Sequence, residues 1–343
     1  MIKPKKAIIS LKGYEPNLNP YLVKLDANEE KDYLSDKIVK NTVFPMNLYP
    51  DNDNTSLSIA IANKWQVSTS EVIVGNGSSE ILELLVKTFV DKDEVVISFE
   101  PSFSMYKIYA TINGATYIPV LPNEDFSLNV STLLSAINEY NPKLIFLCTP
   151  NNPTGYLIPK EAIIEILDQT QAIVVVDEAY MEFSTQDTSV IDLINTFDNL
   201  IVTRTFSKAY GLASLRLGYG LANERLISLL KKVKAPYSVN AYSQIIGQNA
   251  LDLESEMVRY TEASKNRRIN LAKSLSDLGI QIYPSEGNFI FFKSKQNLYE
   301  DLINKGIMIR SFSGELANYY RVTVGSEEEN ALFINAMEAI INE

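Results

Sequence analysis

Short apolar runs alternate with amphipathic helical stretches over most of this 343-residue chain, and this alternation limits its fold more than any other feature. Strand-like runs are expected at residues 72–74, 95–99, 116–120, 144–148, 172–176, 200–205 and 217–222. Helical periodicity is found near residues 55–65, 78–90, 130–138 and 159–169. Strands that are apolar at nearly every position are buried on both faces, and strands separated by helices are mostly parallel. The sequence therefore predicts an α/β fold with a mostly parallel central sheet between layers of helices.

The sequence changes character from about residue 252. A long charged helical pattern over 253–278 leads into strand-like runs at 280–283, 288–292, 307–310 and 319–324. This pattern predicts a smaller α+β domain. We expect an N-terminal arm and part of the small domain at 1–45, a large domain at 46–252, and the rest of the small domain at 253–343.

Composition excludes several kinds of chemistry. Histidine is absent and Cys148 is the only cysteine, so Ser-His-Asp and Cys-His sites cannot form and no metal site is expected. The formal net charge of −11 opposes binding to nucleic acid and to anionic lipid surfaces. No apolar run reaches membrane-spanning length, and the N-terminal residues lack the apolar region of a signal peptide. We therefore expect a cytoplasmic protein with small-molecule partners, which binds neither nucleic acid nor membranes.

Lys208 follows one of the predicted strands, and other polar motifs follow three more. Segments 75–80 and 149–155 and Asp177 come directly after strand-like runs. Ligands of parallel sheets lie at the carboxyl ends of the strands, so we expect these segments to converge on one edge. A lysine after a strand is by itself usually a solvated surface residue. Beside the other motifs, its amine can form a Schiff base with an aldehyde cofactor.

Asp177, Tyr180 and Asn152 can serve the ring of such a cofactor. A carboxylate at the end of an apolar strand needs a cationic or hydrogen-bonding partner, and the protonated pyridine nitrogen of pyridoxal 5'-phosphate is such a partner. Tyr180 and Asn152 can donate to the phenolate oxygen of the same ring. Taken alone, Asp177 could cap a turn and Asn152 could belong to an ordinary turn. Together with Lys208 they predict a pyridoxal 5'-phosphate site, with Lys208, Asp177 and Tyr180 as its catalytic residues.

A phosphate-binding cup is expected where Gly77, Ser78 and Ser79 open a helix after a strand. Backbone N–H groups at a helix N-terminus bind anions, although the same residues could simply cap the helix. Ser207 and Arg216 would complete the cup, unless Arg216 instead pairs with a surface acid.

Three further residues are candidates for ring or substrate contacts. Tyr106 could stack on the cofactor ring, although an aromatic residue there is more often part of the core. Arg321 and Arg310 lie in strand-like runs of the small domain, and arginine can bind a carboxylate through two parallel hydrogen bonds. For Arg310, an ordinary role at a sheet edge is equally consistent with the sequence.

In combination, these motifs resemble the fold-type I aminotransferases that use pyridoxal 5'-phosphate, and within them the histidinol-phosphate aminotransferases. The resemblance covers almost the whole chain, through segments 13–16, 24–29, 49–51, 75–80, 101–106, 148–155, 177–180, 207–216, 222–224, 235–237, 288–289 and 321–325. It implies that Tyr49 reaches the phosphate bound by a neighbouring subunit, and hence a homodimer with shared sites. It also implies that Arg321 binds the anionic end of the substrate, while Tyr14 and Arg310 face a distal phosphate.

The resemblance implies exchange of an amino group between histidinol phosphate and 2-oxoglutarate, which yields imidazole acetol phosphate and glutamate. The sequence departs from the family pattern at 29–34 and at Leu48, which lie in the N-terminal segment expected near the substrate. Two other enzymes therefore stay open: an aromatic amino acid aminotransferase and a decarboxylase of amino acid phosphates. A cofactor-binding regulatory module is disfavoured because no basic helix-turn-helix segment is found.

Overall fold

The computed structural model describes residues 5–9, 11, 14, 17–39 and 43–342. The rest of the predicted N-terminal arm, and part of the stretch considered for a signal peptide, lie outside these residues. Within the described ranges, none of the helices combines the length and the apolar character that crossing a membrane requires.

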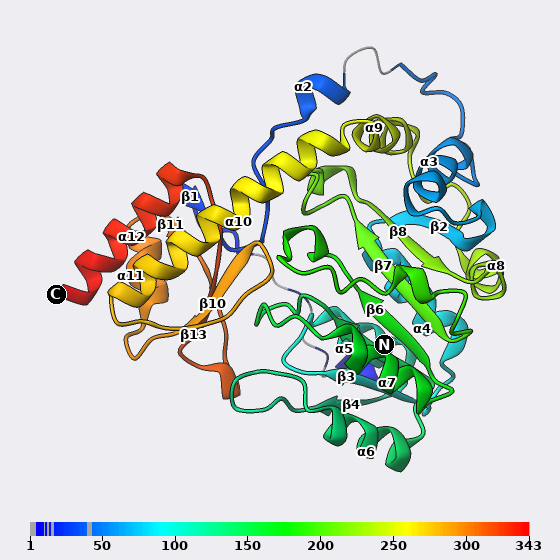
Figure 1. The fold of residues 1–343 in the computed structure, drawn as a ribbon, viewed down its shortest axis with the longest axis horizontal. Helices are drawn as coiled ribbons and strands as arrows, with labels where there is room; N and C mark the ends of the chain where they lie inside the picture. Colours follow the sequence, from blue (N-terminus) through cyan, green and yellow to red (C-terminus); the bar gives the residue numbers. More distant parts are fainter. Residues whose placement is uncertain (1–4, 10, 12–13, 15–16, 40–42, 343) are drawn as a thin grey trace, which may run out of the picture.

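The order of elements follows the predicted alternation up to β8 (Figure 1). The strands are β1 (Val23–Lys24), β2 (Val72–Asn76), β3 (Val95–Phe99), β4 (Thr116–Val120), β5 (Leu144–Cys148), β6 (Ile173–Asp177), β7 (Leu200–Thr205), β8 (Leu217–Ala222), β9 (Gln281–Tyr283), β10 (Phe289–Lys293), β11 (Ile307–Met308), β12 (Arg310–Ser311) and β13 (Tyr319–Thr323). The helices are α1 (Lys6–Ile9), α2 (Ser35–Ile38), α3 (Thr55–Trp65), α4 (Ser78–Phe89), α5 (Met105–Asn113), α6 (Val130–Tyr140), α7 (Lys160–Asp168), α8 (Glu224–Val233), α9 (Ala241–Leu251), α10 (Glu254–Asp277), α11 (Leu298–Asn304) and α12 (Glu327–Asn342).

The large sheet has the strand order β2-β8-β7-β6-β5-β3-β4. Every neighbouring pair is parallel except the two pairs that contain β8, which runs antiparallel to both β2 and β7. Strands β2, β3, β5, β6 and β7 therefore end at the same edge of the sheet. The predicted α/β class, with a mostly parallel central sheet, is confirmed.

Two apolar cores cover the two faces of this sheet. Val174 and Val176 of β6 belong to one core, together with residues of α3, α6, α7 and α9. Val175 points to the other face and belongs to a core with α4, α5 and α8. Successive side chains of a strand point to opposite faces, so burial on both sides requires the nearly uninterrupted apolar runs seen in the sequence.

A second sheet of antiparallel strands, β12-β13-β10-β9, lies beside the large one. Figure 1 shows α10 extending from the large sheet, near α9, towards this second sheet and α12. The N-terminal segment also reaches it, because β1 pairs in parallel with β11. The run expected as one strand at 307–310 is divided, since β11 pairs with β1 whereas β12 pairs with β13. The exact domain boundaries stay a prediction.

Candidate active site

The carboxyl ends of the parallel strands open into a cavity of about 870 Å³ that is lined by residues from both sheets and from the N-terminal segment. The segments predicted to converge do so. The predicted site residues that line this cavity are Tyr14, Ser78, Ser79, Asn152, Asp177, Tyr180, Ser207, Lys208, Arg216, Arg310 and Arg321. Gly77, Tyr106 and Tyr49 are the predicted site residues that lie outside its lining.

Lys208 lies at the wall of the cavity, just beyond the end of β7. Its Nζ atom donates to the carbonyl oxygens of Ala27 at 2.9 Å and Asn28 at 3.1 Å. Burial lowers the pKa of the amine to about 7, and the positive charge of Arg321 acts in the same direction. An amine with such a pKa is substantially unprotonated near neutral pH, which a nucleophile requires.

Asp177 ends β6 and is only 3% exposed. Its carboxylate accepts hydrogen bonds from the Tyr106 hydroxyl at 2.8 Å and the Thr203 hydroxyl at 3.0 Å. Burial raises the pKa of Asp177, while these two donors favour the charged form. Among the described residues no lysine or arginine forms an ion pair with it. The carboxylate therefore suits a cationic nitrogen brought by a ligand.

Tyr106 lies in a different place from the one predicted. Its ring is fully buried beside the sheet and stacks on Phe146, with ring centroids 4.4 Å apart, so it cannot stack on a ligand in the cavity. Phe103, three residues earlier, lines the cavity instead. The difference arises because Tyr106 already belongs to α5 and packs in its core, whereas Phe103 lies in the loop that follows β3. The loop position beyond a strand end was the signal in the sequence for Phe103.

Tyr180 also lines the cavity. Its hydroxyl oxygen accepts hydrogen bonds from the amides of Asn28 at 3.2 Å and Asn152 at 3.4 Å. These two donors leave the hydroxyl proton of Tyr180 available to a ligand. Burial raises the pKa of Tyr180 to about 12, so the hydroxyl stays a donor at neutral pH.

The residues predicted to form a phosphate cup lie close together where α4 begins. Ser78 and Ser79 open the helix, and the guanidinium of Arg216 lies 3.5 Å from the Ser207 hydroxyl. Two glycines make the cup possible. Gly77 has φ +78, and a Cβ atom there would lie 2.7 Å from the Arg216 guanidinium. A Cβ atom on Gly218 would lie 2.2 Å from the backbone nitrogen of Ser78. A side chain at Gly218 would collide with the backbone that opens α4, and one at Gly77 would displace the Arg216 guanidinium, so both glycines are needed for this arrangement.

Arg310 and Arg321 are directly opposite each other on the neighbouring strands β12 and β13. Arg321 is buried, and its guanidinium donates to the carbonyl oxygen of Asp26 at 2.6 Å and to the side-chain oxygen of Asn152. Its Nε atom has no partner among the described residues. Arg310 lies 5.9 Å from the ring centre of Tyr14. The two cations thus share one end of the cavity.

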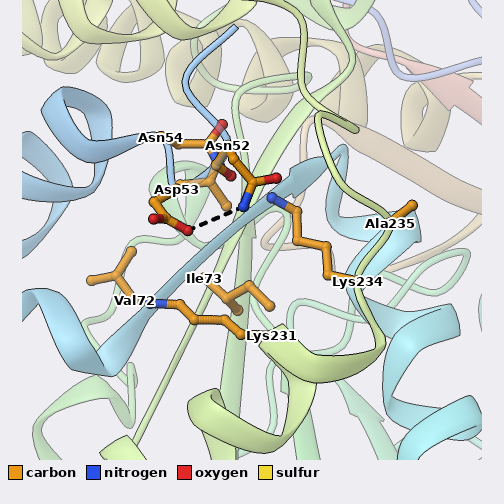
Figure 2. Close-up of a pocket in the computed structure, with 9 residues that line it drawn as sticks. Asn52, Asp53, Asn54, Val72, Ile73, Lys231, Lys234 and Ala235 are labelled. Atoms are coloured by element: carbon orange, nitrogen blue, oxygen red, sulfur yellow. Dashed lines mark hydrogen bonds between the residues drawn. The ribbon is translucent and has the colours of Figure 1, made fainter. Parts of the chain in front are cut away.

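Tyr49 does not line this cavity. It is 79% exposed, and its ring stacks on Tyr237 with centroids 4.6 Å apart. The loop after Tyr49 also contacts Tyr237, because the side chain of Asn52 accepts a hydrogen bond from the backbone N–H of Tyr237 at 3.1 Å. Figure 2 shows Lys234 pointing towards Asn52, which also hydrogen-bonds Asp53, in a small separate pocket. A site in the same chain cannot use Tyr49 in this arrangement.

Besides Phe103, sequence reasoning missed Asn28 and Thr203, which support the site. Asn28 contacts Tyr180 through its side chain and Lys208 through its carbonyl oxygen. Thr203, on β7, orients the carboxylate of Asp177. The signal for Asn28 was its place in the motif at 24–29, and the signal for Thr203 was its position on the strand next to β6.

The sequence model described as "Aminotransferase class I and II" matches residues 22–337, which is nearly the whole chain. The chain belongs to this aminotransferase family. A relative from Thermoanaerobacter sp. (strain X514), named histidinol-phosphate aminotransferase, is 41% identical and aligned over 98% of both chains. Another with that name, from Clostridium novyi (strain NT), is 40% identical over 97% of this chain and 96% of its own.

The fold of this aminotransferase also matches solved structures. The histidinol-phosphate aminotransferase of Sinorhizobium meliloti, solved in complex with pyridoxal-5'-phosphate, superposes with a TM-score of 0.91. It is 22% identical and covers 100% of this chain and 98% of its own. The predicted resemblance to fold-type I aminotransferases is confirmed.

Proposed function

We propose that this aminotransferase uses pyridoxal 5'-phosphate to exchange an amino group between histidinol phosphate and 2-oxoglutarate. When bound, the cofactor supplies an aldehyde for amine exchange and a ring that withdraws electrons from the substrate. The fit of the chain to this group rests on four features of the cavity. They are an amine with a lowered pKa, a buried carboxylate that forms no ion pair among the described residues, a free hydroxyl donor, and a helix start beside Arg216 that depends on two glycines.

Each of these features corresponds to one part of the cofactor. Lys208 would hold the aldehyde carbon and later carry the proton that moves at the substrate carbon. Asp177 would keep the ring nitrogen protonated, and Tyr180 with Asn152 would bind the phenolate oxygen. The phosphate would lie against the cup, whose members are Gly77, Ser78, Ser79, Ser207 and Arg216. Phe103, rather than Tyr106, would cover the ring.

The pairing of Arg310 with Arg321 is the observation that carries the choice of substrate. A phosphate dianion has three oxygens and can accept hydrogen bonds from two guanidinium groups at once, whereas one carboxylate is satisfied by a single arginine. Two opposed arginines at the same end of the cavity therefore favour an amino compound with a phosphate end. The names of the relatives from Thermoanaerobacter and Clostridium agree with histidinol phosphate as that compound.

We also propose a homodimer in which Tyr49 completes the phosphate cup of the partner subunit. The support is the exposure of Tyr49 and its position outside the cavity of its own chain. Mixing subunits that carry Tyr49→Ala with subunits that carry Lys208→Ala should restore activity, because each mixed dimer has one intact site. Failure to regain activity, with sedimentation showing mixed dimers, would contradict shared sites.

The cytoplasmic location stays a prediction.

The substrate assignment is tested by an anaerobic half-reaction of the protein loaded with pyridoxal 5'-phosphate. Histidinol phosphate, histidinol, phenylalanine, tyrosine and threonine phosphate are added separately, and conversion of the cofactor to its amine form is followed by absorbance. We expect histidinol phosphate to react at least about 100-fold faster than histidinol, because the lost charge-assisted bonds are each worth about 1.5–3 kcal/mol. Faster reaction with phenylalanine or tyrosine would make the protein an aromatic aminotransferase. Release of carbon dioxide from threonine phosphate would indicate a decarboxylase.

A further inference from the structure

Glu30 lies in the N-terminal segment that departs from the family pattern, but its side chain is absent from the cavity lining. It is half-buried and contacts Tyr260 of α10 and Asn288, which directly precedes β10. One carboxylate oxygen accepts a hydrogen bond from the Asn288 amide at 2.7 Å, and the other accepts one from the Tyr260 hydroxyl at 2.7 Å. We expected the difference from the family pattern at 29–34 to affect substrate binding. Glu30 instead contacts Asn288, which supports the position of Lys208.

A short chain of hydrogen bonds connects Glu30 to the amine of Lys208. The same nitrogen of Asn288 that donates to Glu30 also lies 3.2 Å from the carbonyl oxygen of Asn28. That carbonyl oxygen accepts the hydrogen bond from Lys208 at 3.1 Å. Asn28 has φ +53, a left-handed conformation that few residues adopt without support. Glu30 and Asn288 therefore fix the orientation of the carbonyl group that receives the lysine.

The same segment also holds the backbone around the lysine. Tyr33 stacks on Tyr260 with centroids 4.0 Å apart, and its hydroxyl donates to the carbonyl oxygen of Ala209 at 2.6 Å. The backbone turns away at Gly211, where a Cβ atom would lie 3.1 Å from the carbonyl oxygen of Lys31. The segment thus lies directly against the turn that follows Lys208.

We propose that Glu30 is a positioning residue for Lys208. Through Asn288 and the Asn28 carbonyl group, Glu30 holds the lysine amine at the cavity wall. Its carboxylate also places a negative charge behind that carbonyl group. The inference rests on the proposed function in one respect, namely that Lys208 is the reactive amine.

The charges around the two groups set the direction of the effect. Glu30 is faced by Tyr260 and Arg267 from α10, by Asn288 and by Lys208; Lys208 is faced by Arg321, Arg216, Glu29 and Glu30. Burial raises the pKa of Glu30 to about 7, against the hydrogen bonds from Asn288 and Tyr260. Burial lowers the pKa of Lys208 to about 7, against the charges of Glu29 and Glu30. The negative charge of Glu30 favours the protonated form of the Lys208 amine, so removing that charge should lower the pKa of Lys208.

The test uses the full chain without added cofactor and the variant Glu30→Gln, which keeps the shape of the side chain and removes its charge. Acetylation of Lys208 by acetic anhydride is measured across a pH series by peptide mass spectrometry. We expect the midpoint for Lys208 to fall by about half a pH unit or more. The matched control is Asp32→Asn, because Asp32 lies two residues away and its carboxylate accepts hydrogen bonds from Ser35 and Leu34. An unchanged midpoint in Glu30→Gln would overturn the proposal.

A second variant, Tyr260→Phe, keeps the stacked ring and removes one donor to Glu30. It should raise the pKa of Glu30 and lower the Lys208 midpoint by less than Glu30→Gln does, whereas a shift in the opposite direction would contradict the proposed connection. Thermal unfolding checks that each variant is folded. If the half-reaction with histidinol phosphate fails while the acetylation midpoint still shifts in Glu30→Gln, only the substrate assignment is contradicted. Normal half-reaction with an unchanged labelling midpoint would remove only the role of Glu30.

Discussion

The cavity has two kinds of wall, and they depend on the sequence in different ways. One wall consists of the strand ends of the large sheet, where Asp177 and Lys208 directly follow β6 and β7. The other wall is the N-terminal segment around Asn28, which lies beside Lys208 although the two are 180 residues apart. The strand ends are placed by the topology of a parallel sheet. The N-terminal segment is placed by individual hydrogen bonds. Single substitutions there should therefore change the positions of Lys208 and Tyr180 and leave their reactive groups in place.

The largest effect is expected at the strand-end wall. Lys208→Ala should reduce kcat by at least about 10⁴-fold, because it removes the amine that we propose to hold the cofactor and to move the proton. The measurement is turnover with histidinol phosphate and 2-oxoglutarate, with circular dichroism to confirm folding. The control is Lys37→Ala, since Lys37 pairs with Glu256 at the surface. Retained activity in Lys208→Ala would contradict the assignment of the lysine.

Asp177→Asn should give the next largest effect, a loss of about 100-fold in kcat, because a neutral amide cannot stabilise a protonated ring nitrogen as a carboxylate does. Thr203→Val is the matched comparison. It removes one of the two hydrogen bonds to the same carboxylate, worth about 1 kcal/mol, and should cost less than 10-fold. Equal losses in the two variants would show that the charge of Asp177 is unimportant. Steady-state kinetics measures both.

Substitutions in the N-terminal wall should reduce activity less than those at the strand ends. They should act mainly through the backbone conformation of this segment. Asn28→Ala and Asn28→Gly both remove the amide that donates to Tyr180. Only alanine must also adopt φ +53 with a Cβ atom, which costs about 1–2 kcal/mol. We therefore expect Asn28→Ala to unfold at lower denaturant concentration than Asn28→Gly, while the two lose similar activity, by about 10-fold or less. Equal stability of the two variants would mean that this conformation is not strained.

The smallest expected effect is the dependence of stability on pH through Lys208. Its pKa is about 7 in the folded protein and 10.5 in its ordinary state. Between these values the unfolded chain binds a proton that the folded chain lacks, so the free energy of unfolding should rise with pH from about 7 to 10.5. A pKa difference of this size corresponds to at most about 5 kcal/mol. Because the side chain is partly exposed to the cavity, we expect only a fraction of it, about 1 kcal/mol. Urea unfolding at several pH values should show this rise in the protein without added cofactor and a smaller one in Lys208→Met.

The same contrast explains how much could be predicted from the sequence. The strand runs at 144–148, 200–205 and 217–222 coincide with β5, β7 and β8, because burial on both faces leaves a clear pattern. The residues that follow the strands were placed correctly in the cavity for the same reason. Tyr106 was misplaced, because whether an aromatic side chain faces the core or the cavity depends on where α5 begins. Glu30 and Asn28 could not be placed, since their partners are hydrogen-bonded across more than 150 residues.

The central claim is that Lys208 is the residue that holds pyridoxal 5'-phosphate. It is tested most directly by loading the protein with the cofactor, reducing with borohydride, and mapping the modified peptides by mass spectrometry. We expect one pyridoxyl-modified peptide, which contains Lys208, and none in Lys208→Ala. Modification of another lysine to the same extent, or no stable modification of Lys208, would contradict it.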